Sequence, residues 1–116
     1  MVRLLALTLY MLILSGCQAN EPETSAFTEE NALIIDVRSA EEFATGHIEG
    51  AINVPLPEIE DMSAYLPIYQ NRSLIVYCRS GYRSSHAVIS LTDMGFTNVY
   101  DLGGLLDWDG PLVSIE

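Results

Sequence analysis

A cysteine that joins a short apolar run to a helical pattern constrains this chain most. Residues 74–77 read Leu-Ile-Val-Tyr, a run typical of a buried strand, and Cys78 follows them directly. Apolar residues then recur at helical spacing, at positions 87, 88, 91 and 94. The sequence therefore predicts a strand, a tight loop over residues 78–84 and a helix, with the cysteine where the strand ends.

The predicted loop reads Cys78-Arg79-Ser80-Gly81-Tyr82-Arg83-Ser84. Backbone N–H groups of such a loop can converge on the sulfur, and a helix N-terminus adds partial positive charge. Arg79 and Arg83 add full charges, and Gly81 gives the loop backbone freedom. These features favour the thiolate, which is the nucleophilic form of cysteine. We therefore expect an exposed, activated thiolate, with Ser84 capping the following helix.

The remaining patterns alternate between strands and helices. Ser39 and Glu42 match a capping box, so a helix is expected from Ala40, ended by Gly46 in the left-handed conformation. A second helix is expected from Pro57 to about Leu66, and Gly103-Gly104 is expected to form a turn into one or two helical turns. Strands are predicted at residues 32–35, 51–54, 73–77 and 97–100. This order indicates an α/β domain with a mainly parallel central sheet, in which ligands bind at the carboxyl ends of the strands.

Charge limits the class of partner. The chain has five arginines and 16 acidic residues, and its formal net charge is −11. A nucleic-acid partner is not expected on this ground, because phosphate binding needs a basic face. Two of the five arginines nevertheless lie in the six residues from Cys78 to Arg83, which indicates a local site for a small anion.

The N-terminus has the pattern of a processing segment. A positive start is followed by an apolar run over residues 4–14, too short to span a bilayer. Leu14-Ser15-Gly16-Cys17 resembles a bacterial lipobox, which implies cleavage before Cys17 and lipidation of that cysteine. The expected organisation is a signal peptide over residues 1–16, a lipidated tether over 17–27 and a domain over 28–116. A buried N-terminal helix with a core cysteine is the alternative.

This reading implies a place in the cell and a role for the other cysteine. A lipid anchor implies the bacterial cell envelope. The expected location is the periplasmic face of the outer membrane in preference to the inner membrane, or the cell surface. Lipidation of Cys17 also leaves Cys78 without a partner in the chain. An unpaired thiol in an oxidising compartment is a liability unless its reactivity is used.

Several motifs together resemble the rhodanese (sulfurtransferase) family. They are Asp36-Val37-Arg38, the stretch over residues 46–55, the loop over 78–84, and Gly103-Gly104 followed by Trp108. The resemblance covers roughly residues 28–110 and implies a three-layer domain whose parallel sheet is flanked by helices. It also implies a persulfide on Cys78, loaded from a small anionic donor such as thiosulfate and unloaded by cyanide, a small thiol or a protein acceptor. Residues 79–83 would bind the donor, Asp36, Arg38 and Ser84 would support the site, and no cofactor or metal is implied.

One departure from the family and two rival functions remain. The strand and helix that usually precede the Asp36 segment are missing or short here, so an exposed or partner-covered sheet edge is expected. Phosphatases and arsenate reductases of this fold carry a Cys-x5-Arg loop, whereas four residues separate Cys78 from Arg83. A non-catalytic binding module is the other rival. Asp36 and Arg38 are expected to have a structural role, either pairing with each other or holding loop backbone. His47 is expected to be a surface or capping residue, and Trp108 a core or rim aromatic over the sheet.

Overall fold

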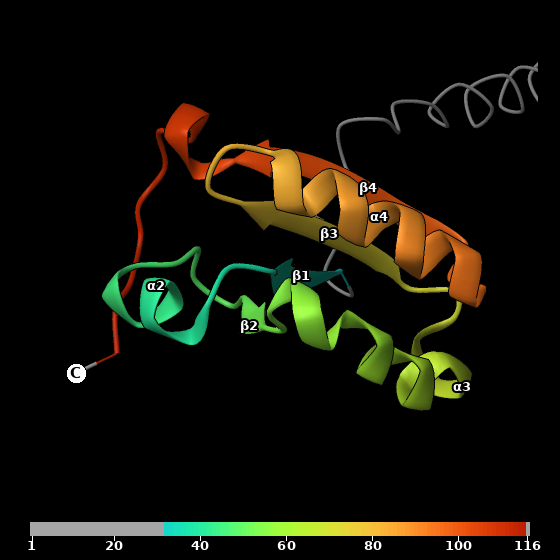
Figure 1. Cartoon of the computed structure of the whole chain (residues 1–116). Helices are drawn as coiled ribbons and strands as arrows, with labels where there is room; N and C mark the ends of the chain where they lie inside the picture. Colours follow the sequence, from blue (N-terminus) through green and yellow to red (C-terminus); the bar gives the residue numbers. More distant parts are fainter. Residues whose placement is uncertain (1–31, 116) are drawn as a thin grey trace, which may run out of the picture.

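The computed structural model describes residues 32–115, and four strands in this range form one sheet. The sheet order is β2-β1-β3-β4 and all three pairings are parallel, so β3 is flanked on both sides (Figure 1). The predicted α/β class with a parallel central sheet is confirmed. The strands are β1 (Leu33–Asp36), β2 (Ile52–Asn53), β3 (Ser73–Cys78) and β4 (Asn98–Gly104).

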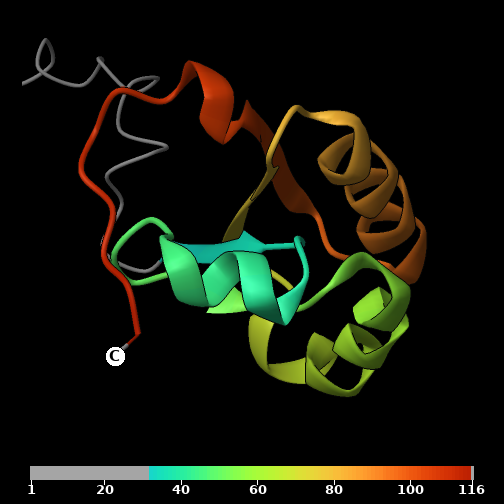
Figure 2. The same cartoon turned by 60° about the vertical axis from the view of Figure 1, so that its left-hand side comes forward.

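Helices flank the sheet and crowd its carboxyl end. The long helix α4 and the 3-10 helix η2 lie side by side over one face of the sheet in both views (Figures 1 and 2). The loop after β3 lies at the same end of the sheet as α2 and η3 (Figure 1). The helical segments are α2 (Ala40–Thr45), η2 (Leu56–Tyr65), α3 (Leu66–Tyr69), α4 (Tyr82–Met94) and η3 (Leu105–Asp107).

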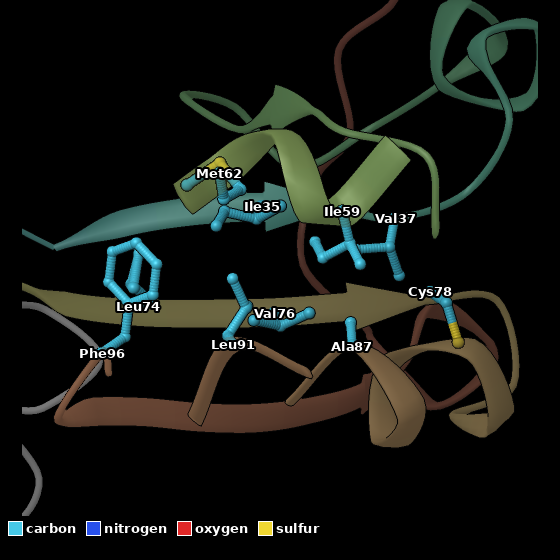
Figure 3. Close-up of a cluster of buried hydrophobic side chains, with 10 residues drawn as sticks. All are labelled: Ile35, Val37, Ile59, Met62, Leu74, Val76, Cys78, Ala87, Leu91 and Phe96. Atoms are coloured by element: carbon cyan, nitrogen blue, oxygen red, sulfur yellow. The ribbon is translucent and has the colours of Figure 1, made fainter. Parts of the chain in front are cut away.

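The main core lies between the sheet and the helices α4 and η2, and it ends at Cys78. Alternate residues of β3, namely Leu74, Val76 and Cys78, face the helices, as expected for a strand of period two (Figure 3). All six residues of β3 are buried, since both faces of the strand are covered. The cysteine is therefore held by the most buried strand of the sheet. The rest of this core is Ile35, Val37, Ile59, Met62, Ala87, Leu91 and Phe96.

The opposite face of the sheet carries an apolar hollow of about 290 Å³. Trp108 lies at its rim with 37% of its surface exposed, as predicted for an aromatic over the sheet. The other lining residues are Ile34, Ile48, Ile75 and Leu102. Within residues 32–115 the sheet edges are β2 and β4, and the expected loss of a first strand concerns residues that lie outside the described range.

The helix predicted from Pro57 to about Leu66 is confirmed, but it is a 3-10 helix. Residues 56–65 form a 3-10 helix, and Pro67 lies in the first turn of α3 instead of stopping a helix. Apolar residues in this segment recur every three positions, at Leu56, Ile59 and Met62. Because residues three apart share a face of a 3-10 helix, this geometry packs them together toward the core.

Two glycine predictions also fail. Gly46 ends α2, but its φ of 165° is extended backbone, and its carbonyl accepts a hydrogen bond from Arg38 Nη2 at 2.6 Å. Gly103 and Gly104 do not form a turn, since β4 continues through them and pairs Gly104 with Cys78 across a register shift. A β-carbon on Gly104 would lie 2.7 Å from Ser80 Cα and closer still to the Arg79 carbonyl. Glycine is needed there because the strand backbone touches the loop.

No helix within residues 32–115 is long and apolar enough to cross a membrane. The predicted signal peptide, Cys17, the whole tether and residues 28–31 of the predicted domain lie outside the described residues.

Candidate active site

The sulfur of Cys78 lies in a cradle of backbone N–H groups. Cys78 ends β3, and the chain then turns sharply through Gly81, whose φ of 104° is left-handed. This turn points two N–H groups at Sγ, from Gly81 at 3.0 Å and from Ser84 at 3.3 Å. Figure 3 shows the side chain directed from β3 toward the first turn of α4. The geometry is that of an anion-binding loop at a helix N-terminus.

The cradle changes the acidity of the thiol. Burial alone would raise the pKa of Cys78, but hydrogen bonds from Ser84, Gly81 and Ser80 outweigh burial and lower the pKa below its ordinary value. A larger fraction of the cysteine is therefore thiolate at neutral pH than in a free thiol.

The expectation of an exposed thiolate is wrong. Cys78 is completely buried, because the loop folds over the sulfur and β4 passes directly beneath the loop at Gly104. The N–H donors that stabilise the thiolate are the same groups that cover it. A donor molecule must therefore reach the sulfur through the loop.

Ser84 does not cap α4. The helix begins at Tyr82 with Gly81 at the N-cap, which places Ser84 in the first turn and buries it. Its hydroxyl donates to Asp101 Oδ1 at 2.7 Å, and the same carboxylate oxygen accepts the N–H of Gly103 at 2.9 Å. Asp101 was not identified from the sequence, because its contact with Ser84 depends on the pairing of β4 with β3.

The exposed side of the loop carries Arg79, Ser80 and Tyr82. No side-chain hydrogen bond or ion pair of Arg79 is formed within residues 32–115, whereas its carbonyl accepts the N–H of Leu106 at 3.1 Å. Tyr82 is 70% exposed and packs edge-on against the ring of His86, which is itself exposed. Arg79 is thus a solvent-facing cation at the mouth of the cradle.

Arg83 is held in an ion pair. Its guanidinium donates to both carboxylate oxygens of Glu42 on α2, at 2.8 and 3.1 Å. Glu42 also closes the predicted capping box by accepting the Ser39 N–H at 3.0 Å. The Arg83 hydrogen bonds are the main cause that lowers the pKa of Glu42 to about 2. The capping role of Glu42 was predicted, but its contact with the cysteine loop was not.

Asp36 and Arg38 form the predicted structural pair at the end of β1. Arg38 Nη2 lies 2.7 Å from Asp36 Oδ2, and both side chains are buried. Asn53 donates to the carbonyls of both residues at 3.0 Å, which joins the pair to β2. His47 caps α2 as expected, through Nδ1 and the Phe43 carbonyl at 2.8 Å, but it is buried and not on the surface.

Among residues 32–115, no cluster of three His, Cys, Asp or Glu side chains could hold a metal ion. The groups gathered around Sγ in the described part of the chain are a thiol of lowered pKa and the backbone N–H donors of Gly81 and Ser84.

Comparison with known proteins agrees with this description of the fold. Residues 23–110 match the model of the Rhodanese-like domain. The chain is 40% identical over 80 residues to the thiosulfate sulfurtransferase PspE of Escherichia coli, which covers 69% of this chain and 77% of that protein. It is 35% identical over 91 residues to a sulfurtransferase of Allochromatium vinosum, which covers 75% and 83%.

A solved structure described as a rhodanese with anions from E. coli superposes with a TM-score of 0.66 at 38% identity, over 72% of this chain and 98% of that one. Two other curated relatives are longer, and the chain spans 27% and 44% of their lengths. A parallel α/β sheet with a thiolate cradle at the carboxyl end of its central strand defines the class of protein. The chain belongs to the rhodanese family.

Proposed function

We propose that this protein is a sulfurtransferase that carries a sulfane sulfur as a persulfide on Cys78. The thiolate attacks the outer sulfur of a donor such as thiosulfate, the S–S bond of the donor breaks, and sulfite leaves with the bonding electron pair. The persulfide anion then passes its outer sulfur to cyanide, a small thiol or a protein thiol, which regenerates the Cys78 thiolate. Neither step has a net need for a further oxidant or reductant.

The observation that carries this proposal is the pair of N–H groups on Sγ. Donors fixed in this way stabilise a sulfur anion before reaction and need no reorganisation when charge develops. The same groups favour both the attacking thiolate and the persulfide that replaces it. Relatives named as sulfurtransferases, at 40% and 35% identity, support the assignment.

The loop favours sulfur transfer over the phosphatase alternative. Four residues separate Cys78 from Arg83, so the loop is one residue shorter than a Cys-x5-Arg loop. Arg83 is also bound to Glu42, which leaves it unavailable for a phosphate group unless that ion pair breaks. The retained and activated cysteine argues against a binding module without catalysis.

We further propose that the domain, over residues 28–116, is held at the bacterial cell envelope. Residues 1–16 would be the signal peptide and residues 17–27 the tether, with the lipid on Cys17. Two or more acyl chains give stable anchoring, whereas one chain binds only weakly. Loss of membrane association in a Cys17→Ala variant, measured by fractionation, would support this location.

The function is tested by intact-protein mass spectrometry of the purified full-length protein before and after incubation with thiosulfate. The expected result is a gain of one sulfur atom, mapped to Cys78, removed by cyanide and absent from Cys78→Ser. Undiminished turnover in that variant would contradict the mechanism. No gain with thiosulfate or polysulfide, in a protein whose thiol still alkylates, would overturn the assignment as a sulfurtransferase.

A further inference from the structure

The cysteine loop offers less positive charge than its sequence suggests. Of the arginines near Cys78, Arg38 is paired with Asp36 and Arg83 with Glu42. Arg79 remains as the cation of the loop that has no side-chain partner within residues 32–115. Asp101 places a further carboxylate next to the loop through Ser84. The fixed charges around the sulfur therefore nearly cancel before the thiolate itself is counted.

The ion pair between Arg83 and Glu42 is built to persist. It is bidentate, the two side chains are 32% and 30% exposed, and Glu42 is anchored a second time by the capping box of α2. A planar guanidinium held by both oxygens of one carboxylate is a strong pairing. A donor anion that uses Arg83 must compete with this carboxylate, which is already in place.

The charge of the donor determines how strongly the pairing of Arg83 with Glu42 affects binding. Thiosulfate carries two negative charges and must approach a thiolate on a protein of formal net charge −11. Each negative charge on the donor is repelled by the thiolate. An unpaired Arg83 would offset this repulsion by attracting the donor, but Arg83 paired with Glu42 does so much less. A donor of low charge avoids most of this penalty.

Resting on the proposed function, we infer that Glu42 is a specificity residue, which neutralises Arg83 so that the site favours an organic persulfide over a dianionic donor. The step balances as a simple displacement. The Cys78 thiolate attacks the outer sulfur of R–S–SH, the S–S bond of the donor breaks, Cys78–S–SH forms, and R–S⁻ leaves and takes a proton from water. No oxidant or reductant is consumed.

The surface around the mouth fits a donor with an organic body. Tyr82 and Leu106 are 70% and 66% exposed. Tyr82 begins α4 three residues after Arg79, and the N–H of Leu106 donates to the Arg79 carbonyl. An aromatic and an aliphatic side chain next to one cation can contact the group R while Arg79 binds a single negative charge.

The inference is tested on the full-length protein by alkylation of Cys78 with two probes of similar size, neutral iodoacetamide and anionic iodoacetate. Glu42→Gln keeps the capping box, since Gln also serves at that position, but frees the Arg83 charge. The ratio of the iodoacetate rate to the iodoacetamide rate is expected to rise roughly threefold or more in this variant. The ratio cancels changes in thiol pKa and in access through the loop.

Glu41→Gln is the matched control, because it removes the same charge from the neighbouring, exposed position of α2. An equal rise in both variants, or no rise in Glu42→Gln, would overturn the inference. The double variant Glu42→Gln with Arg83→Gln removes the pair without changing net charge, so its ratio should stay near that of the unchanged protein.

A second measurement compares kcat/KM for thiosulfate and for a singly charged organic persulfide. Glu42→Gln should raise the value for thiosulfate several-fold and that for the persulfide much less, so the preference for the persulfide shrinks. If both donors load Cys78 but their ratio is unchanged, the role of Glu42 is refuted while sulfur transfer stands. If neither donor loads Cys78, sulfur transfer itself fails, and the alkylation ratio still decides whether Glu42 sets the charge of the site.

Discussion

The Ser84 hydroxyl donates to Asp101 Oδ1 at 2.7 Å, while the backbone N–H of Ser84 donates to Cys78 Sγ at 3.3 Å. A single residue of α4 therefore connects the edge strand β4 to the sulfur. Asp101 also accepts the N–H of Gly103, the residue directly before Gly104, where the strand touches the loop at Arg79 and Ser80. The position of the cradle depends on this link as well as on the loop itself.

We predict that Ser84→Ala destabilises the fold more than it impairs the thiol. Loss of one buried hydroxyl bonded to a carboxylate should lower the free energy of unfolding by about 1 kcal/mol. The pKa of Cys78 should rise because the Ser84 hydroxyl helps to lower it, but the backbone N–H donors remain and limit the rise. Urea unfolding and the pH profile of alkylation measure the two effects. Ser85→Ala, whose hydroxyl bonds the Tyr82 carbonyl at the surface, is the control and should change neither.

Gly104→Ala should damage the loop directly. The added β-carbon meets backbone atoms of Arg79 and Ser80, which cannot move aside as a flexible side chain can. We expect a loss of about 1–3 kcal/mol in stability and a several-fold loss in the rate of persulfide formation, read by mass spectrometry.

Gly103→Ala separates strain from loop damage. Gly103 has a φ of 94° and open space around it, so this variant carries backbone strain without a clash. It should lose stability but keep more of its sulfur transfer than Gly104→Ala. Equal losses of transfer in the two variants would show that contact with the loop is not the cause.

The stability of the domain should fall in acid partly through Glu42. Its ordinary pKa near 4.5 is lowered to about 2 in the fold, so the unfolded chain binds the proton at higher pH than the folded one. The stabilisation of the fold by the Glu42 carboxylate is complete above about pH 4.5 and is lost as the pH falls toward 2. Urea midpoints over this range should fall less steeply in Glu42→Gln. The same slope in both proteins would mean that the Arg83 pair contributes little.

Arg79→Gln should weaken use of anionic donors with little effect on folding. Its side chain is exposed and has no partner within residues 32–115, so its removal costs few contacts. We expect a several-fold rise in KM for thiosulfate with a nearly constant melting temperature. Arg72→Gln removes the same charge at the start of β3, at the far end of the strand, and should leave KM unchanged. A rise in both variants would indicate net charge as the cause.

The sequence was most informative where a pattern is local. The run before Cys78, the capping box of Ser39 and Glu42, and the Asp36 and Arg38 pair all lie within a few residues, and each is present as expected. The parallel sheet followed from the alternation of strands with helices. Local spacing was therefore sufficient to place the cysteine at the carboxyl end of the central strand.

What escaped prediction depends on contacts between distant segments. Glu42 and Arg83 are 41 residues apart, and Ser84 and Asp101 are 17 apart, so neither contact has a local signature. The burial of Cys78 depends on β4 running on through Gly104, where a glycine pair had indicated a turn. The local pattern identified the nucleophile, whereas tertiary packing determines its accessibility and its charged neighbours.

The complete burial of Cys78 means that, in the proposed cycle, sulfur loading and sulfur delivery would take place at different depths below the surface. An S–S bond extends the reactive atom about 2 Å beyond Sγ. Strand, helix and β4 enclose the cysteine from below, so the added atom must be accommodated on the side of the loop. In the proposed cycle, the free thiol is thus hidden from bulky thiols and oxidants, and the persulfide would hold its outer sulfur closer to the surface. Loading would then require a donor whose outer sulfur can enter the loop, while delivery could serve an acceptor as large as another protein.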